Sequence, residues 1–543
     1  MNIKFLILGL VALCVAVFMP IQSARAQSDG ALLDALVKKG VLSDQEAEDV
    51  RASEEKDYAT TGASKINLAS SIKTITFYGD LRLRYELRDG TTSSGFTGTA
   101  GAAGGRDSQD ASRWRYRLRF GVKGDLYDNF FYGIRAATNP NYDRSGNVTF
   151  GHSDAAGPFG KDQSLLALDM VYLGWHATSD LTFTGGQMPN PFYTTSMVWD
   201  DNLNPAGAAE QYDHTFGNTE VFANVGQFVY QAAAGNGFEN GLGAGSSFGT
   251  TFMFSEQVGF KYKFDDNTFF KGAATFNTYS GTKGNGATTV AGLYSTTPIA
   301  LGTSNTSPSF FNGPFVGAAS APTTNVSGIN DLAVLETPFE FDFKIGPGVH
   351  TTDSGDAKDM QEVKTGWELP MRIFGDFAYN FEADARADQA RAAINAVGTG
   401  TGNVGVTAPG GVANAALINS PSFQGVLNSG KGFLDQSAYQ VGVEAGQLKK
   451  KGDWDGKLYW QSTGYYAVDP NLVDADIFNA ATNLQGAVIS VAHNWTDGLS
   501  STLRYAYAMP VNGKMATPNV NQDLTLGDIR QYNLLQADVM WKF

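Results

Sequence analysis

The stretch "SRWRYRLRFGVKGD", from Ser112 to Asp125, alternates strictly between cationic and apolar side chains. The cations occupy the odd positions: Arg113, Arg115, Arg117, Arg119 and Lys123. The apolar side chains occupy the even positions: Trp114, Tyr116, Leu118, Phe120 and Val122. Successive side chains of a β-strand point to opposite faces. The stretch therefore predicts a long strand with one cationic and one apolar face.

The preceding segment, residues 71–88, repeats the same period. Its apolar side chains are Ile75, Phe77, Leu81, Leu83, Tyr85 and Leu87, and Arg82, Arg84 and Arg88 lie on the opposite face with Asp80 and Glu86. A wholly apolar strand face needs a wide apolar neighbour; where that neighbour is lipid, the cations must face a water-filled interior, because an arginine facing lipid at the bilayer midplane costs about 2–4 kcal/mol. The expected pore lining, called the basic strip below, is Arg82, Arg84, Arg88, Arg113, Arg115, Arg117, Arg119 and Lys123. Asp80, Glu86 and Asp125 share its face and can pair with some of its members.

Alternating segments recur to the end of the chain. Tight turns of Asn, Asp and Gly, such as "YDN" (127–129) and "TDG" (496–498), alternate along the chain with long Gly/Thr/Ser-rich connections, such as 280–330 and 383–435. Short turns at one end and long loops at the other are typical of an outer-membrane β-barrel. About fifteen segments can be counted, but a closed antiparallel barrel needs an even number. A strand is missed or a loop misplaced between Gly186 and Asp265, and we predict sixteen strands, with eighteen as the alternative.

One long connection is the candidate constriction loop. Residues 189–217, "PNPFYTTSMVWDDNLNPAGAAEQYDHTFG", carry Asp200, Asp201 and Glu210. Acidic groups facing the basic strip across a narrow passage would orient polar solutes, although the same groups could equally lie in water at the cell surface. The Asp-rich stretch "VDPNLVDADIF" (468–478) lacks a full calcium-ligand pattern and is expected to be a solvated loop.

The two ends of the chain carry recognisable signals. Residues 1–26 combine Lys4, an apolar core and Ala24-Arg25-Ala26, which predicts an export signal peptide. Residues 27–53 predict a helical hairpin with a capping box at Ser43 and Glu46, and 54–70 a polar linker before a barrel spanning 71–543. The last strand, "LLQADVMWKF", ends in Phe543, which resembles the signal read by the outer-membrane assembly machinery.

Charge and composition exclude several classes of function. The chain has 39 basic residues, including Lys4 and Arg25, so the expected mature chain has 37 against 54 acidic residues and a net charge of −17. Such a charge argues against a nucleic-acid partner. The single cysteine, Cys14, lies in the expected signal peptide, and the five histidines have no metal-ligand spacing. We therefore expect no metal and no cofactor.

The chain resembles the bacterial putative porin family of outer-membrane β-barrel porins. The resemblance rests on "LLDALVKKGVLSDQEAEDVRA", "FYGDLRLRYE", "RWRYRLRFGVKG", "GGQMPNPF", "AYQVGVEAGQLKKKGDWDGKLYW" and "DADIFNAATNLQGAVIS". It implies an all-β membrane protein, an antiparallel transmembrane β-barrel with a short N-terminal helical segment, and brings no catalytic residues.

The expected function is a passive channel for small hydrophilic solutes or ions in the outer membrane of a Gram-negative-type bacterium, with or without a preference for anions. The N-terminal helices would lie in the periplasm, and a homotrimer is one possible assembly. The alternative is a structural or adhesive barrel tethered to the cell envelope. An enzyme would need a nucleophile, a base and an orienting acid brought together. The pattern of strands and loops assembles no such set, so we predict no enzymatic activity.

Overall fold

A computed structural model describes residues 37–39, 43, 45–48, 50, 69–92, 108–139, 146–151, 165–231, 251–280, 332–347, 350–353, 362–385, 387–388, 431–470, 472–474, 476–478, 481–514 and 529–543. The chain divides into two compact units, Met1–Ser70 and Ser71–Phe543. The expected signal peptide lies outside the described residues, as do the linker up to residue 68 and most of the helical hairpin.

The first unit retains the capping box that the sequence predicts. The Ser43 backbone N–H donates to Glu46 Oε2 over 2.9 Å, and the Glu46 backbone N–H donates to Ser43 Oγ over 3.3 Å. The two side chains thereby satisfy backbone groups that an unfinished first turn leaves without partners. No helix in the described part of the chain is both long enough and apolar enough to cross a membrane.

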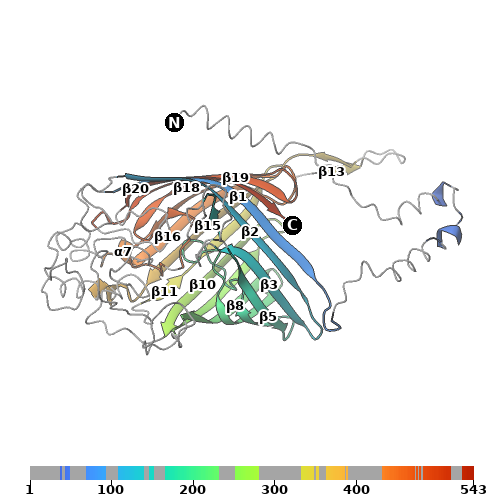
Figure 1. Cartoon of the computed structure of the whole chain (residues 1–543), viewed down its shortest axis with the longest axis horizontal. Coiled ribbons are helices and arrows are strands. Elements are labelled where there is room, and N and C mark those ends of the chain that lie inside the picture. The colour runs from blue at the N-terminus through green and yellow to red at the C-terminus, as the bar shows by residue number, and fades with distance from the viewer. Residues whose placement is uncertain are drawn as a thin grey trace. The chain divides into compact units, whose positions relative to one another are not determined.

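The second unit is a closed antiparallel β-barrel, which Figure 1 shows with its strands inclined to the barrel axis. The strands of its first half are β1 (Thr76–Thr92), β2 (Ser108–Asp125), β3 (Phe130–Asn139), β4 (Val148–Thr149), β5 (Leu165–His176), β6 (Leu181–Gln187), β7 (Ala206–Phe216), β8 (Thr219–Gln231) and β9 (Thr251–Lys263). The others are β10 (Phe269–Ser280), β11 (Ala333–Glu336), β12 (Phe339–Ile345), β15 (Leu369–Asn380), β16 (Ser437–Gly446), β17 (Trp454–Thr463), β18 (Leu484–Asn494), β19 (Leu499–Pro510) and β20 (Ile529–Lys542). A four-residue helix, α7 (Phe433–Gln436), precedes β16.

Closure occurs between the first and last strands. β1 pairs with β2 on one side and with β20 on the other, where Leu83 lies opposite Val539. β11 and β12 form one strand, interrupted at Thr337 and Pro338, because both pair with β10 and β15. β4 is a two-residue piece that pairs with β2 beyond the end of β3. With these pieces accounted for, the barrel has sixteen strands, and the prediction of sixteen is confirmed.

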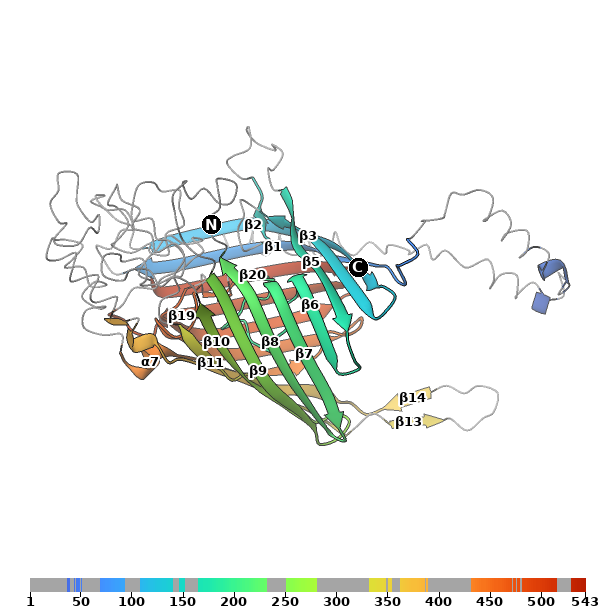
Figure 2. The same ribbon diagram turned by 90° about the horizontal axis from the view of Figure 1, so that it is seen from below.

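β13 (His350–Asp353) and β14 (Glu362–Thr365) pair with each other as a separate two-stranded sheet. Figure 2 shows this hairpin beyond the barrel end at which β7 and β8 are joined. The turn between β7 and β8 is tight, since Phe216 lies directly opposite Thr219. The connection from β12 to β15 thus carries a hairpin at the end where tight turns are otherwise expected.

The outer face of the barrel is apolar, as the period of two predicts. Leu83, Trp114 and Phe120 are 42%, 46% and 44% exposed, whereas Arg84 on the alternate face is 1% exposed. Leu503, Tyr505 and Tyr507 on β19 are also exposed. Because a closed barrel pairs every strand edge internally, such a surface is stable in hydrocarbon.

Candidate functional site

The basic strip lies on the inner wall, where β1 and β2 run side by side. The register places Arg82 opposite Arg117 and Arg84 opposite Arg115. Arg82, Arg84, Arg88, Arg115 and Arg117 are all buried, Arg113 and Arg119 are half-buried, and Lys123 is exposed. A stack of like charges in a partly desolvated wall needs compensating carboxylates.

Two of these carboxylates come from β1 itself and lie within the strip. Asp80 accepts hydrogen bonds from Arg117 over 2.9 Å and from Arg119 over 2.6 Å. Glu86 accepts from Arg113 over 2.7 Å and from Arg88 over 3.0 Å. The sequence predicted Asp80 and Glu86 as partners for the cations, and the structure confirms both. Asp125, the third candidate, instead accepts a hydrogen bond from Thr74.

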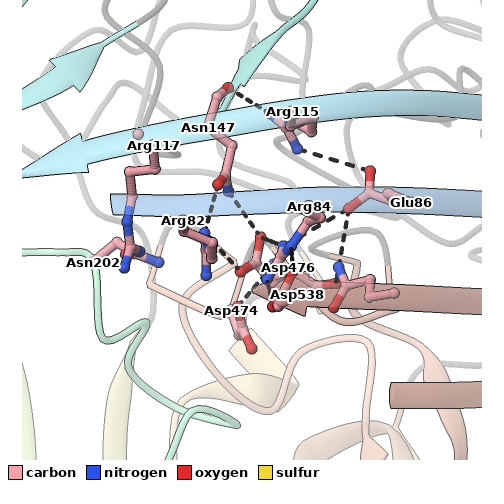
Figure 3. A network of polar contacts seen from close by, with 12 residues as sticks. Arg82, Arg84, Glu86, Arg115, Arg117, Asn147, Asn202, Asp474, Asp476 and Asp538 are labelled. Carbon is pink, nitrogen blue, oxygen red and sulfur yellow. Dashed lines mark hydrogen bonds and ion pairs between the residues drawn. The ribbon is translucent and has the colours of Figure 1, made fainter. Parts of the chain in front are cut away.

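A third carboxylate comes from the last strand, next to the barrel seam. Arg84 Nε lies 2.6 Å from Asp538 Oδ1 and Arg84 Nη2 lies 2.8 Å from Asp538 Oδ2. This two-bond pairing fixes the plane of the guanidinium as well as its position. Figure 3 shows the guanidinium of Arg84 among three carboxylates, those of Asp538, Asp476 and Glu86.

The fourth carboxylate, Asp476, comes from the connection between Thr463 and Leu484, called the β17–β18 loop below. Its Oδ1 lies 2.9 Å from Arg84 Nη1, and its Oδ2 lies 3.7 Å from Arg82 Nη2. The described residues of this loop are buried, except for half-buried Asp474, which shows that the loop folds into the barrel. The prediction of a solvated loop at 468–478 is therefore wrong: the loop is buried, and its Asp476 meets Arg84 and Arg82 of the barrel wall.

Two aspartates of the β17–β18 loop have opposite electrostatic environments. Burial would raise the pKa of Asp476, but Arg84, Arg82, Arg115 and Arg88 outweigh it and hold that pKa well below its ordinary value. Burial and the charges of Asp200 and Asp476 raise the pKa of Asp474 well above its ordinary value. The Asp476 backbone N–H also donates to Asp474 Oδ1 over 2.7 Å.

A second inward segment is the connection between Gln187 and Ala206, called the β6–β7 loop below. Thr194 Oγ1 donates to Glu336 Oε1 and Thr195 Oγ1 donates to Asp376 Oδ2, so two hydroxyls attach the loop to the far wall. Gln257 on β9 accepts from the Tyr193 backbone N–H over 3.0 Å and donates to the Tyr193 carbonyl over 2.8 Å. Most of the described candidate constriction loop thus folds inward.

The two inward loops also touch each other. The Asp200 backbone N–H donates to the Leu472 carbonyl over 2.6 Å, and the Asp474 backbone N–H donates to the Ser196 carbonyl over 3.2 Å. Asn202 on the β6–β7 loop accepts from Arg117 Nη1 over 3.0 Å. The basic strip, the β6–β7 loop and the β17–β18 loop consequently form one polar network across the lumen (Figure 3).

The expected constriction residues are not brought together. Asp200 is buried in the β6–β7 loop and accepts from the Asn202 backbone N–H over 2.8 Å. Asp201 is exposed. Glu210 lies on β7, which is the strand missed between Gly186 and Asp265, so the expected loop 189–217 ends at Pro205. Gln211 reaches the inward loop through Pro191, so its neighbour Glu210 points to the outer face.

Beside this network lies a cavity of about 440 Å³. Arg117, Arg119, Arg135 and Asp169 supply charge to its lining, and Trp199 and Tyr230 supply aromatic surface. Arg135 Nη2 lies 2.7 Å from Asp169 Oδ2. A space lined by both fixed charges and aromatic rings fits a small polar solute. Among the described residues, no group of three or more His, Cys, Asp or Glu side chains could hold a metal ion.

Phe543 closes the seam of the barrel at the end opposite the inward loops. Its backbone N–H donates to the Gly79 carbonyl over 3.1 Å, and its carbonyl accepts from the Gly79 backbone N–H over 3.0 Å. Its ring lies 6.5 Å from that of Phe120 and 5.0 Å from that of Trp541. A Cβ at position 79 would lie 2.6 Å from the Phe543 ring, which requires glycine there.

A closed sixteen-stranded barrel with an apolar outer face and a charged interior defines the class of outer-membrane channel proteins. The family model described as "putative porin" matches residues 63–527. The chain therefore belongs to this porin family, and it is an outer-membrane porin channel.

Among solved structures, the chain is similar to a mutant porin of Rhodopseudomonas blastica, with 8% identity, 87% of this chain and 100% of that chain covered, and a TM-score of 0.34. It is also similar to the outer membrane channel DcaP of Acinetobacter baumannii, with 12% identity, coverage of 88% and 100%, and a TM-score of 0.34. No curated protein matches the sequence.

Proposed function

We propose that the chain is a passive diffusion channel whose passage is narrowed by two loops rather than one. The observation that carries this proposal is the polar network that joins the β6–β7 loop to the β17–β18 loop and to the basic strip. A barrel of sixteen strands is wide enough for an aqueous pore, and inward loops set its size limit. Small hydrophilic solutes would cross down their concentration gradients.

The charge of the lining supports a preference for anions. Seven guanidinium groups of the basic strip contact or adjoin four carboxylates, Asp80, Glu86, Asp476 and Asp538, which leaves a surplus of three positive charges. Arg117 and Arg119 carry part of this positive charge to the cavity, where Arg135 is paired with Asp169. Because most of the guanidiniums are paired, we propose a modest preference, expressed at the cavity rather than along the whole strip.

The cellular setting follows from the same proposal. Phe543 would be read by the outer-membrane assembly machinery, and outer-membrane lipids would surround the apolar face. The N-terminal helices would lie in the periplasm. We also propose that the chain self-associates, with a homotrimer as the assembly to be tested. The basic strip would contribute to selectivity, and it would also hold the two loops against the barrel wall.

Uptake by vesicles tests this function against a structural or adhesive barrel. Purified chain in phosphatidylcholine vesicles should admit small sugars and exclude larger ones, with a rate that rises linearly with the concentration gradient. Vesicles without protein are the blank, and a heat-unfolded sample is the matched control. If folded protein leaves the vesicles as tight as the blank, the channel proposal fails and the structural barrel is favoured.

A further inference from the structure

The barrel wall is incomplete between β5 and β8. Figure 2 shows β5, β6, β7 and β8 side by side in one wall. β6 pairs with β5 only from Val171 onward, and β7 pairs with β8 only as far as Phe228. Residues 165–170 of β5 and 229–231 of β8 consequently have no strand on that side within the described part of the chain. We call the space between these two strand edges the wall gap.

The wall gap exists because the chain leaves the wall before it reaches the height of the neighbouring strands. β6 ends at Gln187 and β7 begins at Ala206. Between them the Met188 backbone N–H donates to the Pro205 carbonyl over 2.9 Å, and the β6–β7 loop turns inward. Neighbouring strands lie about 4.8 Å apart, so the three spacings from β5 to β8 make the wall gap about 14 Å wide.

The wall gap lies in the part of the barrel that lipid surrounds. Leu166 and Leu168 on β5 are exposed on the outer face, as are Val229 on β8 and Phe252 on β9. Hydrocarbon cannot satisfy the N–H and C=O groups of a strand edge. A gap between two such edges therefore favours a ligand that brings polar atoms to the edges and apolar atoms to the lipid side.

The cavity of about 440 Å³ reaches into the wall gap. Its lining includes Leu168 and Val229, which are 63% and 42% exposed on the outer face, and Phe228, which is buried on the inner face. The lining also includes Leu472, whose carbonyl accepts from the Asp200 backbone N–H where the two inward loops meet. A cavity with this lining extends through the wall, from the outer face to the contact between the two loops.

The inner end of the cavity carries a net positive charge. Arg117 and Arg119 both pair with Asp80, and Arg135 pairs with Asp169. Three guanidiniums thus meet two carboxylates, which leaves one positive charge in excess. All three arginines line the cavity, and guanidinium groups bind carboxylates through two parallel hydrogen bonds. The cavity is therefore cationic on its lumen side and apolar at its mouth.

We propose that the wall gap is a side entrance through which an amphipathic carboxylate, with one carboxylate on a single apolar chain, enters the cavity from the membrane. The carboxylate accepts from Arg119, and the apolar chain lies between Leu168 and Val229. The volume is that of a small-molecule site, and the single excess charge favours a single-chain monoanion over a two-chain phospholipid. This inference goes beyond the proposed function, in which hydrophilic solutes pass along the barrel.

Photolabelling in vesicles tests the side entrance. The unaltered chain in phosphatidylcholine vesicles is irradiated with dodecanoate that carries a diazirine at the end of its chain, and labelled peptides are identified by mass spectrometry. The Leu168 peptide should be labelled, and excess dodecanoate should abolish that label. Leu458, an exposed residue on β17, reports labelling from the bilayer, which dodecanoate should leave unchanged. Equal suppression at the two sites, or none at either, overturns the proposal.

Two further competitors identify the ligand chemistry. Dodecylamine has the same chain with a cationic head and should leave the label at Leu168 unchanged, because the guanidiniums repel it. Phosphatidylglycerol is an anionic lipid with two chains and should compete far more weakly than dodecanoate. Competition by phosphatidylglycerol as strong as that by dodecanoate would assign the wall gap to a membrane lipid and overturn the proposal.

Substitutions locate the head and the chain of the ligand. Arg119→Gln should raise the concentration of dodecanoate that halves the label about tenfold, because a hydrogen bond to a charged group is lost. Val229→Trp should abolish the competable label at Leu168, because the ring fills the mouth of the cavity. Val221→Trp, at an outward valine of β8 that β7 still flanks, is the matched control and should keep the label.

The outcome is independent of conduction. Both tryptophan variants should migrate as folded barrels before heating. If folded Val229→Trp keeps the same competable label as Val221→Trp, the proposal is overturned. Because labelling is measured without current, its failure leaves the passive channel intact, and a chain that binds dodecanoate without conducting would contradict the channel alone.

Discussion

Asp476, on the β17–β18 loop, lies 2.9 Å from Arg84 of β1, a residue that is 1% exposed and also bonded to Asp538. This pair holds a long connection inside the barrel against the wall that carries the basic strip. A buried ion pair is weak evidence of net stability, but removing one partner leaves a desolvated charge behind. The pair is therefore a suitable point at which to perturb the passage.

Replacing the carboxylate should release the β17–β18 loop. Asp476→Asn leaves Arg84 and Arg82 short of a counter-charge, and we expect the docked loop to lose about 3–5 kcal/mol. Single-channel conductance should rise and fluctuate, while the barrel still resists unfolding until heated. Asp266→Asn, in the exposed β9–β10 turn, is the matched control and should behave as the unaltered chain. An Asp476→Asn conductance equal to that of the control would contradict the role of the Asp476–Arg84 pair in holding the β17–β18 loop inside the barrel.

Acidity should act on the same loop through Asp474. Its raised pKa means that the docked loop binds a proton more tightly than the released loop does. Docking is thus favoured at low pH and is lost as the pH rises through the raised pKa. We expect loop-open fluctuations to become more frequent with rising pH, and Asp474→Asn to remove that dependence. A pH profile that is unchanged by Asp474→Asn would argue against this carboxyl as its source.

The opposite wall should hold the β6–β7 loop through two hydroxyls. Thr195→Val removes the donor to Asp376 and leaves a buried carboxylate without that partner, at a cost of about 1–3 kcal/mol. The double variant Thr194→Val with Thr195→Val should raise the size limit for sugars in vesicle uptake. Thr195→Ser keeps the hydroxyl, so its size limit for sugars should equal that of the unaltered chain. A raised size limit in Thr195→Ser would show that the hydroxyl does not hold the loop to the wall.

Selectivity should depend on the guanidiniums at the cavity. Arg119→Gln with Arg135→Gln removes two positive charges from its lining, and we expect the reversal potential in a salt gradient to move toward cations. Lys123→Gln changes an exposed residue of the strip that lies 5.3 Å from the Tyr78 ring, and its shift should be smaller. A larger shift for Lys123→Gln would place the selective charge elsewhere.

The walls of the barrel could be predicted from sequence, because period-two alternation is a property of each strand by itself. Tyr116 faces lipid and Arg117 faces the lumen because successive side chains of a strand point to opposite faces. β7 was missed because "AGAAEQYDHTF" puts a glutamate on its outer face and small residues around it, so its alternation is weak.

The inner network could not be predicted, because it depends on where loops fold. Nothing local to Asp476 distinguishes it from a solvated aspartate; its partners, Arg82 and Arg84, come from the other end of the chain. Ion pairs between neighbouring strands, such as Glu86 with Arg113, could be predicted from the sequence, because the two side chains share a face and lie on adjoining strands. Contacts between the two loops could not be predicted in this way, because their residues do not lie on one face of adjoining strands.

The most direct test of the account is a planar-bilayer recording of the unaltered chain beside Asp476→Asn. The account predicts stepwise, passive conductance for the unaltered chain, with a linear dependence on the ion gradient, and a larger conductance for the variant. A folded protein that inserts without conducting would contradict the channel itself. Equal conductance of the two chains would contradict the second inward loop as part of the constriction.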